Sequence, residues 1–110
     1  MGRKGFLGEF EHMVLAAVVR LGDGAYGAAI IQEIGEQTGR NVPGGSLYVT
    51  LDRLESKGLL NSRMGEPDAR RGGRPKRFMT PTANGLEALR EVREAMLNLW
   101  DGIEDRLEKS

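Results

Sequence analysis

The sequence contains no cysteine and a single histidine among its 110 residues. Without thiols the chain has no disulfides and no thiolate metal sites, which fits a cytoplasmic protein. His12 stands without clustered carboxylates, so we predict a packing or surface role and no metal site. Gly72-Gly73 is not followed by the Lys-Ser or Lys-Thr of a phosphate-binding loop. We therefore predict that the protein is not an enzyme and has no cofactor.

Long apolar runs are also missing. No stretch approaches the roughly 20 apolar residues that span a bilayer, so we expect no membrane contact. The start of the chain, residues 1–6, lacks the apolar segment and the cleavage site of a signal peptide. With 110 residues, 39% of them hydrophobic, the chain is expected to form a globular unit with a modest core.

The net charge is zero, but the charges are distributed unevenly. Residues 1–39 carry a net charge of −2, and residues 78–110 carry −3. Between them, residues 40–77 hold nine basic against four acidic residues, a net charge of +5. A basic block in a neutral chain indicates a local surface for an anionic partner such as nucleic acid.

Apolar residues at helical spacing predict two helices, at about residues 9–21 and 26–38. Gly27, in the first turn of the second helix, is expected to permit the close approach of another element. A third helix is predicted within Pro43–Gly58, because Pro43 and Gly44-Gly45 interrupt the chain before it and Gly58 stops it.

The third helix has two unlike faces. Leu47, Leu51 and Leu54 are expected to anchor it to the domain. The other face is predicted to expose hydroxyls, an aromatic ring and cations, at Ser46, Tyr48, Val49, Thr50, Arg53 and Lys57. Hydroxyl and guanidinium groups are suited to phosphates and base edges in a major groove. The alternative is an ordinary amphipathic helix with a solvated face.

A hairpin is predicted after Gly58. Residues 59–64 and 76–80 are expected to be its strands, and a polar segment rich in Gly and Pro joins them. Its tip carries the five cations Arg70, Arg71, Arg74, Lys76 and Arg77. A solvated loop is the alternative explanation for such a charge run. Three helices followed by a basic hairpin are typical of a winged helix-turn-helix, so residues 1–81 are expected to bind double-stranded DNA.

From Thr82, a plausible N-cap, the chain is predicted to be helical to near its end. The helix would be about 39 Å long, longer than a small three-helix domain can cover. Its expected interface residues are Leu89, Val92, Met96, Leu99, Trp100 and Ile103. Most of them follow heptad spacing, so we expect residues 82–110 to form a homodimer. The alternative is a helix folded back along its own domain. The fold class is thus mainly α with a small β-hairpin and a long C-terminal helix.

Nearly the whole chain resembles the PadR family of transcriptional regulators, in its short subclass with one C-terminal helix. The similar segments are Leu7–Glu11, Ala25–Ile30, Gly45–Leu59, Arg71–Phe78 and Thr82–Gly85. Three positions depart from the family pattern. Val49 stands where the family usually has Pro, Met79 where an aromatic is common, and Pro81 in place of Leu. Because Pro81 cannot donate a hydrogen bond, we expect the second strand to end early.

The resemblance implies a homodimeric repressor that binds a pseudo-palindromic operator. In some relatives a small molecule binds between the C-terminal helices and stacks on a Trp, which makes Trp100 a possible contact for an effector. Trp100 is equally explained as a residue that packs the dimer interface. A different function also fits the sequence, namely a protein-interaction module that uses its C-terminal helix without specific DNA binding.

Overall fold

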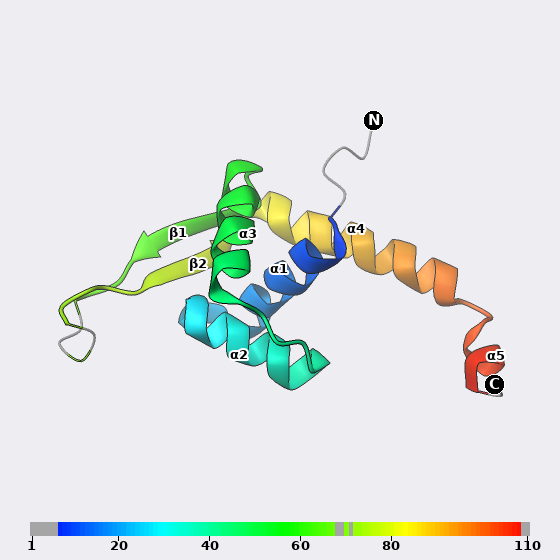
Figure 1. Cartoon of the computed structure of the whole chain (residues 1–110). Coiled ribbons are helices and arrows are strands. Elements are labelled where there is room, and N and C mark those ends of the chain that lie inside the picture. The colour runs from blue at the N-terminus through cyan, green and yellow to red at the C-terminus, as the bar shows by residue number, and fades with distance from the viewer. Residues whose placement is uncertain (1–6, 68–69, 71, 109–110) are drawn as a thin grey trace.

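The structure, a computed structural model, describes residues 7–67, 70 and 72–108. In this part of the chain, three helices precede a hairpin and two further helices (Figure 1). The elements are α1 (Glu9–Leu21), the 3-10 turn η1 (Gly22–Gly24), α2 (Gly27–Thr38), α3 (Gly44–Ser56), β1 (Leu60–Met64), β2 (Arg77–Pro81), α4 (Ala83–Trp100) and α5 (Glu104–Glu108). This order, with its antiparallel hairpin, confirms the predicted winged helix-turn-helix fold.

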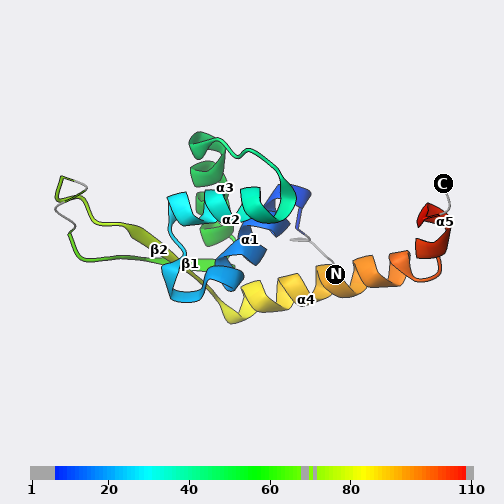
Figure 2. The same cartoon turned by 90° about the horizontal axis from the view of Figure 1, so that it is seen from below.

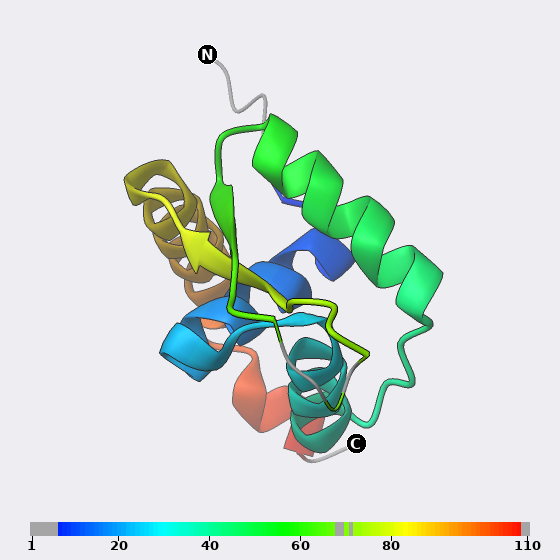
Figure 3. The same ribbon diagram turned by 90° about the vertical axis from the view of Figure 1, so that its left-hand side faces the viewer.

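α1 is the element against which the others pack. Its apolar residues recur at helical spacing, and Val14, Leu15 and Val18 are completely buried. α2, α3, β2 and α4 all contact it, and Figure 3 shows α1 between α3 on one side and α4 on the other. The rest of the core comes from each neighbouring element, with Ile30, Ile34, Leu47, Leu51, Leu54, Leu60, Met79 and Val92 as its main members.

The hairpin is fixed to the body of the domain through the turn that precedes α2. The N–H of Met79 in β2 donates to the carbonyl of Ala25 at 2.8 Å, and Tyr26 forms a β-bridge with Phe78. β2 therefore lies between β1 and this segment. The sequence did not predict the link, because Ala25 and Tyr26 lie outside any stretch with strand periodicity.

The expectation that Pro81 shortens the second strand is wrong. β2 includes Pro81, which pairs with Leu60 at the end of the hairpin next to α4. A proline is tolerated at the terminal position of a strand, where the loss of one donor leaves the rest of the ladder intact.

α4 begins against the end of α3. Thr82 is its N-cap, as predicted, because the Thr82 hydroxyl accepts a hydrogen bond from the Gly85 N–H at 2.9 Å. The same hydroxyl donates to the carbonyl of Gly58 at 2.7 Å. Gly85 lies directly on the carbonyl group of Leu59, so a Cβ at this position would overlap the backbone. The absence of a side chain at Gly85 is therefore what lets α4 start so close to β1.

The prediction of a single helix from Thr82 to near the end of the chain is wrong. α4 has 18 residues and ends at Trp100, which makes it about 27 Å long. Asp101 is extended and Gly102 has a φ of +87°, so the chain turns before α5. Glycine adopts such a φ readily because it has no Cβ. Figure 2 shows α4 passing beside α1 and extending beyond the other helices, with α5 past its end and the hairpin at the opposite end of the molecule.

No helix among the described residues combines the length and the apolar character that crossing a membrane requires.

The contact at Gly85 can be tested by substitution, because it should reverse the usual effect of alanine on the free energy of unfolding. Alanine normally stabilises a helix relative to glycine by about 0.5–1 kcal/mol. Here the added Cβ meets the Leu59 carbonyl, so Gly85→Ala is expected to lower the free energy of unfolding by about 1–3 kcal/mol. Urea denaturation measures the change. Asn84→Ala, an exposed change in the same turn, is the control and should shift stability by at most about 0.5 kcal/mol. A Gly85→Ala variant that is more stable than the wild type would contradict this account of the α4 start.

Candidate nucleic-acid interface

α3 divides its side chains between the core and solvent much as the sequence predicts. Leu47, Leu51 and Leu54 are buried against α1 and α2. Ser46, Tyr48, Val49 and Arg53 are exposed, with Val49 at 57%. α3 therefore presents a small hydroxyl, an aromatic ring, a branched aliphatic group and a guanidinium on its outer face.

The predicted exposure of Thr50 is wrong. Thr50 retains 4% of its accessible surface and lies in the buried stripe of α3. It follows Leu47 by three positions and precedes Leu54 by four, so the helix turns it toward the core together with these leucines. A buried hydroxyl cannot reach a base edge, and Thr50 is removed from the candidate contacts.

Tyr48 packs on the first turn of α2. A Cβ at Gly27 would overlap the Tyr48 hydroxyl group, which confirms the expected close approach at this glycine. About half of the Tyr48 surface remains exposed. The ring therefore joins α3 to the start of α2 and still presents an edge to solvent.

Lys57 is held by an acidic residue of α1. Its ammonium group lies 2.8 Å from the Glu11 carboxylate, which also accepts a hydrogen bond from the Gly8 N–H at 3.1 Å. Burial alone would raise the pKa of Glu11, but the hydrogen bonds from Lys57 and Gly8 outweigh it, and the pKa lies below its usual value. Lys57 thus fixes the end of α3 to the start of α1. The sequence did not indicate this role for Glu11.

Arg77 is also engaged by acidic side chains of α3. Its guanidinium lies 2.6 Å from the Glu55 carboxylate and 3.1 Å from that of Asp52. Partial burial would lower the pKa of Arg77, but the hydrogen bonds to Glu55 and Asp52 prevail and raise it. The hydroxyl of Ser62 in β1 donates to the same Glu55 at 2.9 Å. Arg77, which pairs with Met64 at the loop end of the two strands, is therefore bound to α3.

The hairpin and the residues between its strands, 60–81, are called the wing below. Two cations of the wing lie over aromatic rings. The Lys76 ammonium is 4.2 Å from the centre of the Tyr26 ring, and the Arg63 guanidinium is 4.7 Å from that of Phe78. The two rings meet edge to face, with centroids 5.7 Å apart. Lys76 was a predicted DNA contact, whereas Arg63, Tyr26 and Phe78 were not singled out. The sequence could have indicated such contacts, because basic and aromatic residues lie opposite one another on the two predicted strands.

The tip of the wing carries the remaining predicted cations. Arg70 and Arg74 are exposed, and Arg71 lies outside the described residues. Gly72 and Gly73 have φ values of +72° and +83°, so the chain reverses there in a conformation that other residues rarely adopt. The wing extends beyond the helices (Figure 1).

The predicted interface residues on the C-terminal helix fall into two groups. Val92 is 4% exposed and Leu89 is partly buried against the core. The first half of α4 is thus folded back along its own domain, and the expectation that Val92 faces a second chain is wrong. Leu86 in the first half is exposed, but most exposed apolar side chains lie further on, at Met96, Leu97, Leu99, Trp100, Ile103 and Leu107. Ile103 belongs to the turn after α4 and not to the helix.

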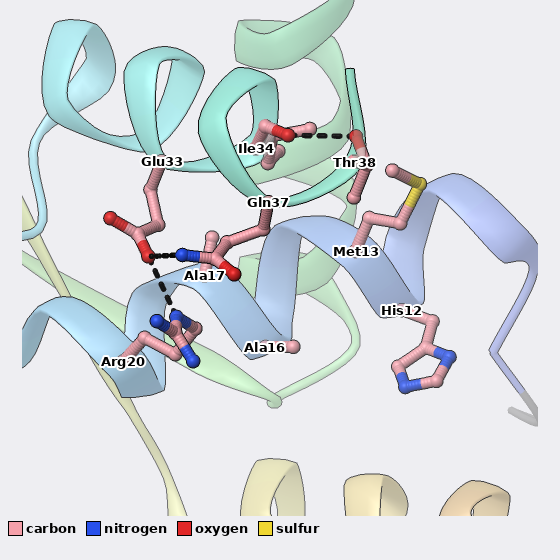
Figure 4. A pocket seen from close by; sticks show the side chains of 9 residues that line it. All are labelled: His12, Met13, Ala16, Ala17, Arg20, Glu33, Ile34, Gln37 and Thr38. Atoms are coloured by element: carbon pink, nitrogen blue, oxygen red, sulfur yellow. Dashed lines mark hydrogen bonds and ion pairs between the residues drawn. The ribbon is translucent and has the colours of Figure 1, made fainter. Parts of the chain in front are cut away.

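A hollow of about 460 Å³ lies between α1 and the second half of α4. Its lining is mainly apolar and consists of His12, Ala16, Leu89, Arg93, Met96, Leu97, Trp100 and Glu104. Trp100 therefore borders a concave surface, as either proposed role of this residue requires. A smaller hollow of about 170 Å³ lies between α1 and α2 and shares His12 and Ala16 with the first (Figure 4).

Figure 4 shows polar groups at one edge of the smaller hollow. Arg20 forms an ion pair with Glu33 at 2.6 Å, and the Gln37 amide donates to the same carboxylate at 3.3 Å. His12 lies at the other edge, away from this pair. The described residues contain no group of histidine and acidic side chains that could hold a metal ion.

Comparisons with known proteins agree with this geometry. The sequence model of the transcriptional regulator PadR-like family matches residues 14–91. A PadR-family transcriptional regulator from Eggerthella lenta is similar, with 30% identity and a TM-score of 0.69 over 93% of this chain and 88% of that one. The fold also resembles a PadR-family transcription regulator from Clostridium difficile, with a TM-score of 0.74 at 20% identity over 91% and 99% of the two chains. The curated proteins yield no match.

The Glu11–Lys57 contact predicts a pH-dependent contribution to stability. Because the pKa of Glu11 is lowered in the folded chain, its stabilising effect is complete above the unfolded pKa of about 4.3 and is lost as the pH falls through the folded value. Glu11→Gln is therefore expected to cost about 1–2 kcal/mol at pH 7, and the difference from the wild type should shrink in acid. Chemical denaturation at several pH values measures it.

Glu9→Gln serves as the control for that measurement. The Glu9 carboxylate is exposed and lies 3.4 Å from Arg40, a surface ion pair worth at most about 1 kcal/mol. An equal loss of stability in both variants, or a Glu11→Gln effect that does not depend on pH, would show that the Lys57 contact is not what stabilises the end of α3.

Proposed function

Because the chain belongs to the PadR-like family of transcriptional regulators, we propose that it is a homodimeric repressor that binds a pseudo-palindromic operator in double-stranded DNA. The observation that carries the proposal is the outer face of α3 beside a cationic wing, joined at Arg77. In winged helix-turn-helix proteins a helix of this kind enters the major groove and the wing reaches the flanking backbone.

The contacts divide into two classes by their chemistry. Ser46, Tyr48, Val49 and Arg53 project from α3 and would meet base edges and nearby phosphates. Arg70 and Arg74 at the wing tip, with Arg71 beside them in sequence, would bind the backbone through charge and contribute little to sequence preference. Lys57 lies against Glu11, Lys76 over the Tyr26 ring and Arg77 against Glu55. We therefore assign to these three residues mainly the shape of the interface and its positive potential.

Dimerisation is supported by the apolar surface at the far end of α4. Leu99 is 69% exposed, and Met96, Trp100 and Ile103 lie near it on α4 and the following turn. An exposed apolar patch of this kind is typical of an interaction surface. A second copy related by a two-fold axis would cover the patch and place two α3 helices on one duplex. Residues 82–110 then form the dimerisation segment, with the first half of α4 also serving the core of residues 1–81.

We further propose that the hollow bordered by Trp100 admits a small-molecule effector in the dimer. Its mainly apolar lining and one indole ring suit a flat, weakly polar ligand. The alternative role, in which Trp100 only packs against the second copy, uses the same surface. A ligand that binds there and leaves operator affinity unchanged would favour the packing role.

A second candidate function is supported by the same exposed side chains of α4. If they bind a different protein, and the wing is only solvated, the chain would be an interaction module without specific DNA binding. The zero net charge fits this alternative, whereas the family and the cationic wing favour the repressor.

The two classes of contact predict different mutant behaviour. Arg74→Ala should weaken binding to all duplexes alike and reduce the slope of log affinity against log salt concentration by about 1. Val49→Ala should instead change the preferred bases, because Val49 is exposed on α3 and suited to apolar contact with a thymine methyl. Fluorescence anisotropy with labelled duplexes at several salt concentrations tests both. Arg90→Ala, which removes an exposed cation of α4 outside the wing, is the control and should leave affinity and slope unchanged. Equal slopes for Arg74→Ala and the wild type would remove the wing from the interface.

The dimer surface is tested by adding a charge to it. Leu99→Asp places a carboxylate in the apolar patch and should weaken self-association by at least about tenfold, because an unpaired charge would be buried. Asn98→Asp adds the same charge at the neighbouring exposed polar position and should leave the dimer intact. Sedimentation equilibrium gives the mass of each variant. A wild-type chain that remains monomeric at micromolar concentration would exclude the proposed dimer.

A further inference from the structure

Two acidic residues lie on the helix that the proposed function places in the major groove. Asp52 and Glu55 belong to α3, and the Asp52 side chain is 68% exposed. A carboxylate near phosphates lowers affinity by repulsion, so electrostatics alone would favour neutral residues at both positions. Their presence in the most basic part of the chain calls for a compensating role.

The contacts of these carboxylates indicate what that role is. Glu55 accepts a hydrogen bond from each strand of the wing, from Arg77 of β2 at 2.6 Å and from Ser62 of β1 at 2.9 Å. Asp52, one turn earlier on α3, binds the same guanidinium at 3.1 Å. Arg77 thus spans two carboxylates of α3, and Glu55 spans the two strands.

We propose that Arg77, Asp52, Glu55 and Ser62 form a positioning cluster that fixes the angle between the wing and α3. The inference rests on the proposed function, since the angle matters only when both elements contact one duplex. Arg77 is then a positioning residue rather than a phosphate contact, although its place in the basic segment had suggested direct DNA binding.

The wing has a second attachment to the body of the domain, and together with the cluster it defines the angle between the wing and α3. The wing is also fixed to the body at the other edge of β2, where Met79 bonds to Ala25 and Tyr26 meets Phe78. That attachment holds β2 to the turn before α2. α3 also packs against β1, and the cluster adds directional hydrogen bonds from α3 to both strands. Attachments on different sides of the wing define an orientation that one alone does not.

The chemistry of the cluster suits a rigid connection. Both contacts come from one guanidinium nitrogen, Nη2, whose N–H groups are fixed in the plane of the guanidinium, whereas a lysine ammonium rotates about its last bond. The Arg77 side chain is 27% exposed, less than its Asp52 partner, so its hydrogen bonds are partly shielded from water. The pair with Glu55 is therefore stronger than a fully solvated surface ion pair.

The test uses a substitution for which electrostatics and the positioning cluster predict opposite changes in DNA affinity. Glu55→Gln removes a negative charge beside the DNA, and simple electrostatics predicts tighter binding. Loss of the cluster predicts the opposite, a weakening of about 5- to 10-fold toward a specific duplex. Glu66→Gln, which removes the same charge from the loop of the wing outside the cluster, is the matched control and should bind equally well or more tightly. Thermal melts establish that each variant is folded.

A double-mutant cycle separates positioning from direct contact. If Arg77 acts through Glu55, then Glu55→Gln should weaken binding in the wild type and have little effect in an Arg77→Ala background. Arg77→Lys keeps the charge and should recover only part of the affinity. Ser62→Ala changes no charge and should weaken binding in the same direction, which keeps the test available if Glu55→Gln fails to fold.

The outcomes distinguish the two proposals. A wild-type chain without sequence-preferring duplex binding would overturn the proposed function and this inference with it. Wild-type binding together with tighter binding by Glu55→Gln, or additive effects of Glu55→Gln and Arg77→Ala, would overturn the positioning cluster alone and leave the repressor proposal intact.

Discussion

The buried contact between α1 and α3 is the interaction on which the rest of the structure depends. Leu47, Leu51 and Leu54 of α3 share one core with Val14 and Val18 of α1, and all five are buried. Because one face of α3 is committed to this contact, its other face is necessarily turned outward. The same α1 also supports α2, β2 and the first half of α4. A single helix therefore determines where the outer face of α3 lies and where the C-terminal helix leaves the domain.

Charged contacts refine what the hydrophobic core establishes. Apolar packing places α3 on α1 but specifies its exact orientation weakly, since branched aliphatic side chains tolerate small rotations. Lys57 with Glu11 at one edge, and Arg77 with Asp52 and Glu55 at another, add directional hydrogen bonds. These five charged residues thus help to define the relative position of α1, α3 and the wing.

Features of the fold that depend on residues close together in the sequence were predictable, and contacts between distant residues were not. The leucine stripe of α3, the Thr82 cap and the close approach at Gly27 were predictable, because each depends on residues a few positions apart or on the steric demands of one glycine. Partners 46 and 22 residues apart, as in Lys57–Glu11 and Arg77–Glu55, leave no periodic signal.

The errors have the same origin. Thr50 was expected to be exposed because its hydroxyl suggested DNA, but the helix position that it shares with the leucines buried it. The apolar spacing of the last segment continues across Gly102, so periodicity predicted a helix through a residue whose backbone turns the chain. Val92 was expected to face a second copy. Helical spacing identifies the apolar face of a helix, but it does not show whether that face packs on the same chain or on another one.

We propose that α3 and the wing of two copies together recognise a symmetric DNA sequence. Selection of bound duplexes from a randomised library, followed by sequencing, tests it most directly. Two symmetric copies should enrich two inverted half-sites whose centres are about 10 base pairs apart, or a multiple of that spacing. Recovery of sequences with no shared motif at moderate salt, or of a single unpaired half-site, would contradict it.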